Sequence, residues 1–428
     1  MSVKLLSRND KKLKFEIEID LTGSMLVVEE KILNALNEAG CFATAEKLKL
    51  FDTDGSPIVI GQMKLTSRCQ NNETYQTPYG AVDVERHVYQ TSAGGKVYCP
   101  LEVAARIINT ATPRFAKILS NKYARLSAPE AHKDLIENHG RQISIRYLQD
   151  VSEAVAAIAE LKEEVWEYHV PPLKEAIKSV AISLDGAFVL MQKEGYREAM
   201  VGSISLYDAM GERQYSLYLG AKPEYGKAEF KARLEREIEH IKTLYPKANY
   251  IGIADGAKTN WEFLKRHTDK QLIDFYHVTE YLSDAAEAAY SNKSEKPARK
   301  AWLEDKCHQL KHDKDGALTI LAELKELKQK NKLKKEIRDN LNATITYIEN
   351  NHAMMQYHLY VKKKLPIGSG VTEAACKTLI KQRFCKSGMR WKEHGMKVVL
   401  SLRQIIQSET RWDQFWEKIN QYGVPVKP

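Results

Sequence analysis

The chain has 428 residues, of which 65 are lysine or arginine and 56 are acidic, so its formal net charge is +9. Its 43% hydrophobic content is that of a globular protein large enough for several cores, and no stretch reaches the ~20 apolar residues of a membrane-spanning helix. The six cysteines include no Cys-x-x-Cys pair, which favours neither a zinc ribbon nor a disulfide framework, while the basic charge points only weakly to a polyanionic partner.

Residues 1–105 are predicted to form a small α/β module. Polar and apolar residues alternate over 13–19 as in a strand, and residues 27–36 have helical spacing. Two further strands are expected at 80–89 and 96–101, joined across a glycine-containing turn. This segment contains no catalytic signature.

Residues 106–170 are predicted to be helical and to contain a helix-turn-helix. A capping box that begins at Ser127 starts one helix, and Gly140 ends it. If the next helix enters a major groove, Arg141 and Arg146 would lie near phosphates or base edges. An ordinary helical hairpin fits the same residues equally well.

Residues 175–284, which follow a Pro-Pro boundary, are predicted to form a sheet with covering helices. The expected strands are 180–190, 199–207, 214–219, 250–254 and 271–276, and the expected helices are 227–245 and 261–267. The order β-β-β-α-β-α-β is that of a ribonuclease H-like core, an α/β fold with a mixed sheet.

The rest of the chain is predicted to complete this core after an all-helical insertion. Residues 285–364 are almost continuously helical and rich in lysine, which also fits a solvated helical bundle. Residues 365–428 return to the core with a helix that starts near Val371 and with the C-terminal helices.

Two aspartates at predicted strand ends and a glutamate inside a helix form the most informative pattern. Asp185 lies in Val-Ala-Ile-Ser-Leu-Asp-Gly, Asp255 in Ile-Gly-Ile-Ala-Asp-Gly, and Glu373 in Gly-Ser-Gly-Val-Thr-Glu. Carboxylates at strand ends can converge on two divalent cations about 3.5–4 Å apart, which act on a phosphodiester. Each aspartate alone is more simply a turn residue before glycine, but the combination favours a metal site that cuts and joins DNA.

Basic residues follow the predicted glutamate at helical spacing. Lys377 and Lys381 are expected beside its carboxylate, where they could hold a DNA strand. The buried side of the helix is expected to consist of Ala375, Cys376, Leu379 and Ile380. Further on, Arg383, Arg390 and Trp391 are candidates for phosphate contact and base stacking. A basic surface helix followed by a loop with one anchoring tryptophan is the alternative.

Asp274 and His277 are expected at the end of the last core strand. They could orient the backbone of the site or a flanking nucleotide. A lone histidine in such a place is more often a hydrogen-bonded structural residue.

The second half of the chain resembles bacterial insertion-sequence transposases of the Kra type, which are DDE enzymes related to Mutator-like transposases. The resemblance covers most of residues 175–420 and is carried by the segments 253–261, 274–282, 366–377 and 387–391. By this likeness Asp185, Asp255 and Glu373 correspond to the metal-binding triad. Asp274 and His277 resemble the Cys/Asp-x-x-His element, and those enzymes also carry a helical insertion before the glutamate.

The resemblance implies a transposase that uses two Mg²⁺ or Mn²⁺ ions per site to cleave transposon ends and transfer them to target DNA. Double-stranded DNA and further copies of the chain are the expected partners. The first residues lack a signal-peptide core, so we expect a cytoplasmic, nucleoid-associated protein of a bacterium, with no membrane contact. The alternatives are a nuclease that cuts without joining and a non-catalytic DNA-binding protein derived from a transposase.

Overall fold

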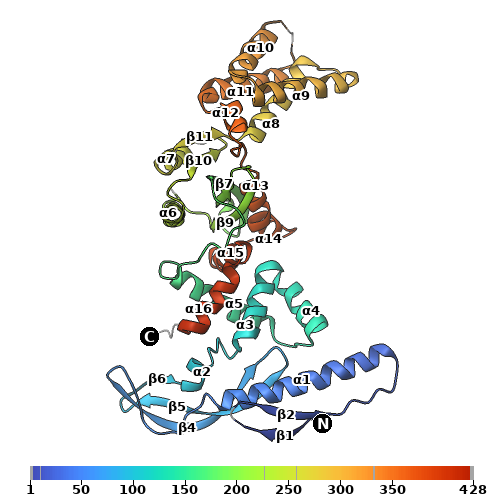
Figure 1. Cartoon of the computed structure of the whole chain (residues 1–428). Coiled ribbons are helices and arrows are strands. Elements are labelled where there is room, and N and C mark those ends of the chain that lie inside the picture. The colour runs from blue at the N-terminus through green and yellow to red at the C-terminus, as the bar shows by residue number, and fades with distance from the viewer. Residues whose placement is uncertain (1–2, 10, 226, 257, 331–332, 425–428) are drawn as a thin grey trace. The chain divides into compact units, whose positions relative to one another are not determined.

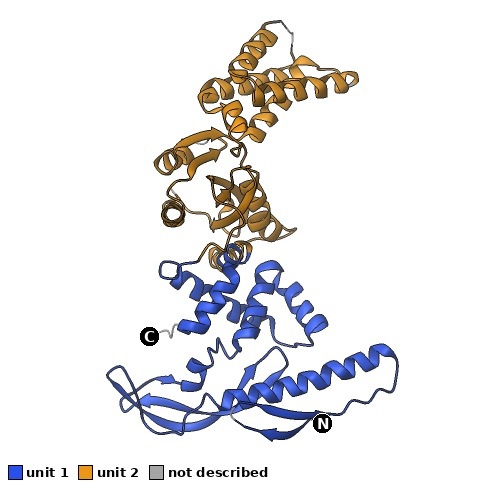
Figure 2. Cartoon of the chain, viewed as in Figure 1, with its two compact units in different colours: residues 1–168, 401–406, 410–428 blue, residues 169–400, 407–409 orange. Residues whose placement is uncertain are grey.

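The computed structural model describes residues 3–9, 11–225, 227–256, 258–330 and 333–424 and is a mixed α/β protein (Figure 1). The chain forms two compact units (Figure 2). The first contains residues 1–168, 401–406 and 410–428, and the second contains 169–400 and 407–409. No helix among the described residues is long and apolar enough to span a membrane.

The first unit begins with the predicted α/β module. Its elements are β1 (Val3–Arg8), β2 (Leu13–Ile17), α1 (Met25–Lys49), β3 (Ile58–Ile60), β4 (Met63–Gln76), β5 (Ala81–Thr91) and β6 (Gly94–Tyr98). β1 pairs with β2, and β3 to β6 form an antiparallel sheet in chain order. The long strand β4 was not predicted, because its polar run Cys69–Thr74 lacks the alternation of a half-buried strand.

Helices make up the rest of the first unit. They are α2 (Pro100–Ala104), α3 (Pro113–Arg125), α4 (Ala128–His139), α5 (Ile145–Lys162), part of α15 (Glu393–Gln407) and α16 (Arg411–Tyr422). The capping box at Ser127 is present, and Gly140 has the left-handed φ of 59° that ends α4, so both helix ends are confirmed. Phe415 of α16 contacts Trp166 with ring centroids 5.7 Å apart. Residues 410–428 therefore belong to the first unit, whereas the sequence predicts that residues 365–428 belong to the ribonuclease H-like core.

The second unit is built on a five-stranded mixed sheet in the order β11-β10-β7-β8-β9. Its strands are β7 (Ser179–Met191), β8 (Gly195–Tyr207), β9 (Arg213–Ala221), β10 (Asn249–Ala254) and β11 (Lys270–Ile273). The first three are antiparallel neighbours, whereas β10 runs parallel to β7 and β11 parallel to β10. Helices α6 (Ala228–Leu244) and α7 (Lys258–His267) connect the later strands, so the predicted order of elements is confirmed.

The last strand is shorter than predicted. β11 ends at Ile273, so the predicted end of the strand at 276 is wrong. Asp274 directly follows the strand and caps the helix α8 (Phe275–Ala289), whereas His277 lies inside that helix. The apolar pair Phe275-Tyr276 extends the strand pattern in the sequence, but the carboxylate of Asp274 accepts the Tyr276 and His277 N–H groups and starts the helix there.

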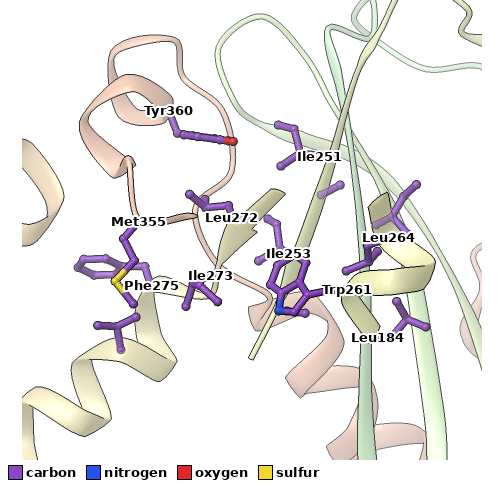
Figure 3. Packing of buried hydrophobic residues seen from close by; sticks show 14 of the residues in the cluster. Leu184, Ile251, Ile253, Trp261, Leu264, Leu272, Ile273, Phe275, Met355 and Tyr360 are labelled. Carbon is purple, nitrogen blue, oxygen red and sulfur yellow. The ribbon is translucent and has the colours of Figure 1, made fainter. Parts of the chain in front are cut away.

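The predicted helical segment follows. It consists of α8, η1 (Lys293–Glu295), α9 (Lys296–His312), α10 (Gly316–Lys330), α11 (Lys335–Asn351), η2 (His352–Met354) and α12 (Tyr357–Lys362). Its core is continuous with that of the sheet, since one buried cluster includes Ile253 of β10 together with Leu282, Leu324 and Ile348. Figure 3 shows Trp261 and Leu264 near Ile253, and Phe275 and Met355 beside Ile273. The segment is therefore packed into the unit and is not a detached solvated bundle.

Candidate active site

Asp185 and Asp255 lie on neighbouring strands, just beyond the point where β7 and β10 stop pairing. Asp185 is in the middle of β7 and pairs with Val201 of β8, so it does not end its strand as the sequence predicts. Pairing between the parallel strands β7 and β10 ends at Ser183 and Ile253, and each aspartate lies two residues further along its strand direction. Because the two strands run in the same direction, this register brings the two aspartates to neighbouring positions. Burial raises the pKa of Asp185, and the charge of Asp255 raises it further.

Glu373 reaches the same region from the helix α13 (Gly370–Ala375). The neighbouring residue Thr372 is fully buried, and its hydroxyl lies 2.6 Å from the hydroxyl of Ser203 in β8. This contact fixes the helix on the sheet while the Glu373 side chain remains exposed. Partial desolvation by its neighbours raises the pKa of Glu373, as do the charges of Asp274 and Asp185. The three predicted carboxylates are therefore electrostatically linked, Asp255 and Glu373 each through Asp185.

An open pocket of about 800 Å³ lies beside Asp185 and Glu373. Its lining consists of Asp185, Gly370, Glu373, Ala374, Cys376, Lys377, Lys381 and Gln382. Asp255 lies outside the lining of this pocket. The structure thus brings two of the three predicted acids into the pocket, together with the two predicted lysines.

A π-helical turn, η3 (Cys376–Lys381), continues the glutamate helix along the pocket and is followed by α14 (Gln382–Phe384). The predicted buried side is confirmed, and its residues are Ala375, Cys376, Leu379 and Ile380. The Cys376 thiol donates to Asp185 Oδ2 at 3.4 Å, and the N–H of Gly186 donates to Asp185 Oδ1 at 2.7 Å. The charge of Lys381 opposes the rise in the pKa of Asp185. The glutamate segment, which consists of α13, η3 and α14, therefore supplies Glu373, a donor to Asp185 and the lysines of the pocket.

Asp274 joins the start of α8 to the loop before Glu373. Its side chain is only 1% exposed. One carboxylate oxygen accepts from the N–H groups of Tyr276 and His277 at 2.6 and 3.2 Å. The other accepts from the N–H and the hydroxyl of Ser369. Asp274 is thus a positioning residue for the segment that carries the glutamate.

His277 lies in the first turn of α8, and its Nδ1 is 3.4 Å from a carboxylate oxygen of Glu280. When protonated, His277 opposes the rise in the pKa of Glu373 that partial desolvation and the nearby acids cause. Its ring meets the rings of Tyr281 and Tyr347 edge-on, at centroid distances of 5.4 and 5.8 Å. These two tyrosines were not singled out in the sequence. The Tyr347 hydroxyl donates to the carbonyl oxygen of Asp255 across 92 positions of chain, and no local pattern signals such a contact.

Two of the predicted DNA-binding residues after the pocket are structural. Arg383 is only 2% exposed, and its guanidinium lies 5.0 Å from the ring centroid of Trp391, so the prediction that Arg383 faces DNA is wrong. The Trp391 indole N–H donates to the Phe384 carbonyl at 3.0 Å, and its backbone pairs with the end of β7. Trp391 is thus the anchoring tryptophan of the alternative interpretation. Arg390 is exposed.

The predicted helix-turn-helix residues differ in accessibility. Arg141 is only 7% exposed, donates to Gln76 Oε1 at 2.6 Å and lies over the ring of Phe115, so the prediction that Arg141 contacts DNA is wrong. Arg146 is exposed and forms an ion pair with Asp150 at 2.8 Å, one turn further along α5. Arg146 remains a candidate for phosphate contact.

The donor chemistry around the pocket fits Mg²⁺ or Mn²⁺, because both ions prefer carboxylate oxygens. Asp185 is a half-buried carboxylate near the charge of Asp255, and a cation would compensate that charge. Within the described ranges, no three His, Cys, Asp or Glu side chains are grouped closely enough to form a complete metal site. The structure therefore shows an acidic pocket with suitable donors.

Comparisons of the sequence with protein-family models and with curated proteins gave no match.

Proposed function

We propose that this protein is a DDE-type DNA transposase similar to those of Kra-type insertion sequences. The observation that carries the proposal is the placement of Asp185 and Asp255 on neighbouring strands with Glu373 on a helix packed against the sheet, and with electrostatic links from Asp185 to the other two carboxylates. Asp185 and Glu373 line a pocket, and burial and neighbouring charges raise the pKa of each, which is typical of catalytic carboxylates.

The topology of the second unit supports a ribonuclease H-like core. Three antiparallel strands followed by two strands parallel to β7, with the first strand in the centre, match the arrangement expected for such a fold. The all-helical segment between β11 and the glutamate helix matches the insertion of the resembled family.

In the proposed site, Asp185, Asp255 and Glu373 would hold two Mg²⁺ or Mn²⁺ ions. When bound, such ions favour deprotonation of the attacking hydroxyl and stabilise the charge on the leaving oxygen. Lys377 and Lys381 line the same pocket and would bind phosphates of the strand that is cut.

The proposed reaction has two steps. Water first attacks the phosphodiester at the transposon end, and the bond to the 3′ oxygen breaks to leave a 3′-OH. That hydroxyl then attacks a target phosphodiester, so that one ester bond forms as another breaks. Double-stranded DNA and a homo-oligomer that holds two ends are the proposed partners, in the cytoplasm and on the nucleoid of a bacterium.

Cleavage and strand transfer on oligonucleotide duplexes from the flanking genomic DNA test the proposal. With Mg²⁺ or Mn²⁺ we expect nicking at the element end followed by joining, and Asp185→Ala should abolish both while DNA binding persists. Asp269→Ala is the matched control, because Asp269 accepts from the Tyr250 N–H at the opposite end of β10. Cutting without joining would identify a nuclease, and sequence-specific binding without cutting would identify a DNA-binding protein.

A further inference from the structure

The helical segment contacts the backbone at Asp255. The Tyr347 hydroxyl, from α11, donates to the Asp255 carbonyl oxygen at 2.6 Å. Asp255 is the first residue after β10, and the pairing of β10 with β11 ends one residue earlier, at Ala254. A bond to its carbonyl fixes the peptide plane, and with it the direction in which the side chain leaves the strand.

The turn after Asp255 gives the Tyr347 ring access to the backbone. Gly256 has a φ of +113°, which side-chain-bearing residues rarely adopt. A Cβ at this position would lie 3.4 Å from Tyr347 Cε2 and 3.6 Å from its hydroxyl oxygen. The ring therefore lies directly against the turn, and Asn351 of the same helix lies beside it.

The position of the Tyr347 ring is fixed by α8. Tyr281 stacks on Tyr347 with centroids 4.1 Å apart and planes 13° apart. The hydroxyl of Thr344 in α11 donates to the Tyr281 carbonyl at 3.0 Å, which ties the two helices together. Burial raises the pKa of Tyr347, so its hydroxyl keeps its proton and remains a donor at neutral pH.

We propose that Tyr347 is a positioning residue that orients Asp255 toward the cations shared with Asp185. The inference rests on the proposed function and adds a role for the helical segment, whose α8 also carries the contact of Asp274 with Ser369. In this arrangement the α8–α11 pair holds the backbone on both sides of the site, at Asp255 through Tyr347 and before Glu373 through Asp274.

Mn²⁺ binding to the full chain without DNA, measured by calorimetry or by water proton relaxation, tests the inference. Tyr347→Phe keeps the ring and its stacking on Tyr281 but removes the donor. One hydrogen bond of this kind contributes on the order of 1 kcal/mol, so the Mn²⁺ affinity should fall about fivefold. Asp185→Ala should reduce the affinity far more.

Tyr250→Phe is the matched control. The Tyr250 hydroxyl donates to the Tyr245 carbonyl at 3.0 Å, at the opposite end of β10 from Asp255. Tyr250→Phe thus also removes a tyrosine-to-carbonyl hydrogen bond beside β10. If Tyr347 had a merely structural role, the two variants should have the same Mn²⁺ affinity. We expect Tyr250→Phe to keep the wild-type Mn²⁺ affinity, with thermal unfolding of both variants confirming that they are folded.

The outcomes separate the two hypotheses. If binding depends on Asp185 but Tyr347→Phe binds Mn²⁺ as tightly as the wild type, or no more weakly than Tyr250→Phe, the positioning role is wrong and the proposed function stands. If the wild type binds no Mn²⁺, or Asp185→Ala binds it equally well, the proposed function fails and the role of Tyr347 fails with it.

Discussion

Replacement of Asp274 tests whether one buried carboxylate joins two segments of the candidate site. Asp274 accepts four hydrogen bonds, two from the start of α8 and two from Ser369 in the loop before the glutamate helix. Asp274→Ala leaves these donors without their partner in a place where the side chain is only 1% exposed.

The magnitude follows from the two halves of the contact. Loss of an N-cap destabilises a helix by about 1 kcal/mol, and hydrogen bonds to a charged group contribute about 1.5–3 kcal/mol each. Since water and relaxation recover part of this, we expect Asp274→Ala to lower the free energy of unfolding by about 4 kcal/mol. Asp274→Asn keeps the cap but turns an amide N–H₂ group toward the Ser369 N–H, so its loss should be about 2 kcal/mol.

Urea denaturation and calorimetry of the full chain provide the assay. The unfolding transition of the second unit should move to lower urea concentration and lower temperature in all three variants. The decrease should be largest for Asp274→Ala, smaller for Asp274→Asn and smallest for Ser369→Ala, which removes only one hydroxyl donor. If Asp274→Ala unfolds within about 1 kcal/mol of the wild type, the argument that this carboxylate is the link is refuted.

Three other predictions concern the charge of Asp185, the packing of Trp391 and the lysine charge of the pocket. Burial raises the pKa of Asp185, so the folded protein favours the protonated carboxyl. In EDTA the free energy of unfolding of the wild type should therefore fall as the pH rises above the ordinary pKa of 3.8. Urea denaturation at several pH values should show that Asp185→Asn removes this loss. Trp391→Ala should destabilise the protein by about 3–5 kcal/mol in the same assay, whereas Arg390→Ala should change stability by less than about 0.5 kcal/mol, because only Trp391 is packed. Lys381→Ala should lower the salt dependence of DNA affinity by about one phosphate contact in fluorescence anisotropy, and an unchanged slope would remove Lys381 from the DNA interface.

The elements of the second unit were predictable because its strands are short apolar runs separated by glycines. The runs at 180–190 and 250–254 correspond closely to β7 and β10. The boundary at Asp274 was not predictable from periodicity, since Ile273, Phe275 and Tyr276 continue an apolar pattern. There a side-chain cap overrides the strand pattern, and only the hydrogen bonds of the carboxylate decide where the helix starts.

The accessibility of arginines was the least predictable feature of the site. The sequence predicts DNA contacts for Arg141 and Arg146 from a helix-turn-helix pattern, and for Arg383 and Arg390 from a basic stretch that contains aromatic residues. In the structure Arg141 and Arg383 are buried and lie over the rings of Phe115 and Trp391. A guanidinium packs well on an aromatic face when its donors find partners, and those rings come from positions that local spacing does not connect.

The same reasoning explains why the carboxylates of the site were easier to find than the residues that hold them. Each acid interrupts or follows an apolar stretch, or follows glycines at a helix start, and those are local signals. One hydrogen-bond donor to Asp185 is the thiol of Cys376 on the glutamate segment, and one donor to the Asp255 carbonyl is the hydroxyl of Tyr347, on a helix beyond the last strand. The first bond requires the glutamate segment to be folded on the sheet, and the second requires the helical segment to be folded on it, in agreement with the core that the helical segment and the sheet share. The orientation of the acids is therefore a property of the whole second unit, so substitutions at Tyr347 or Asp274 are expected to alter the site without touching a carboxylate of the triad.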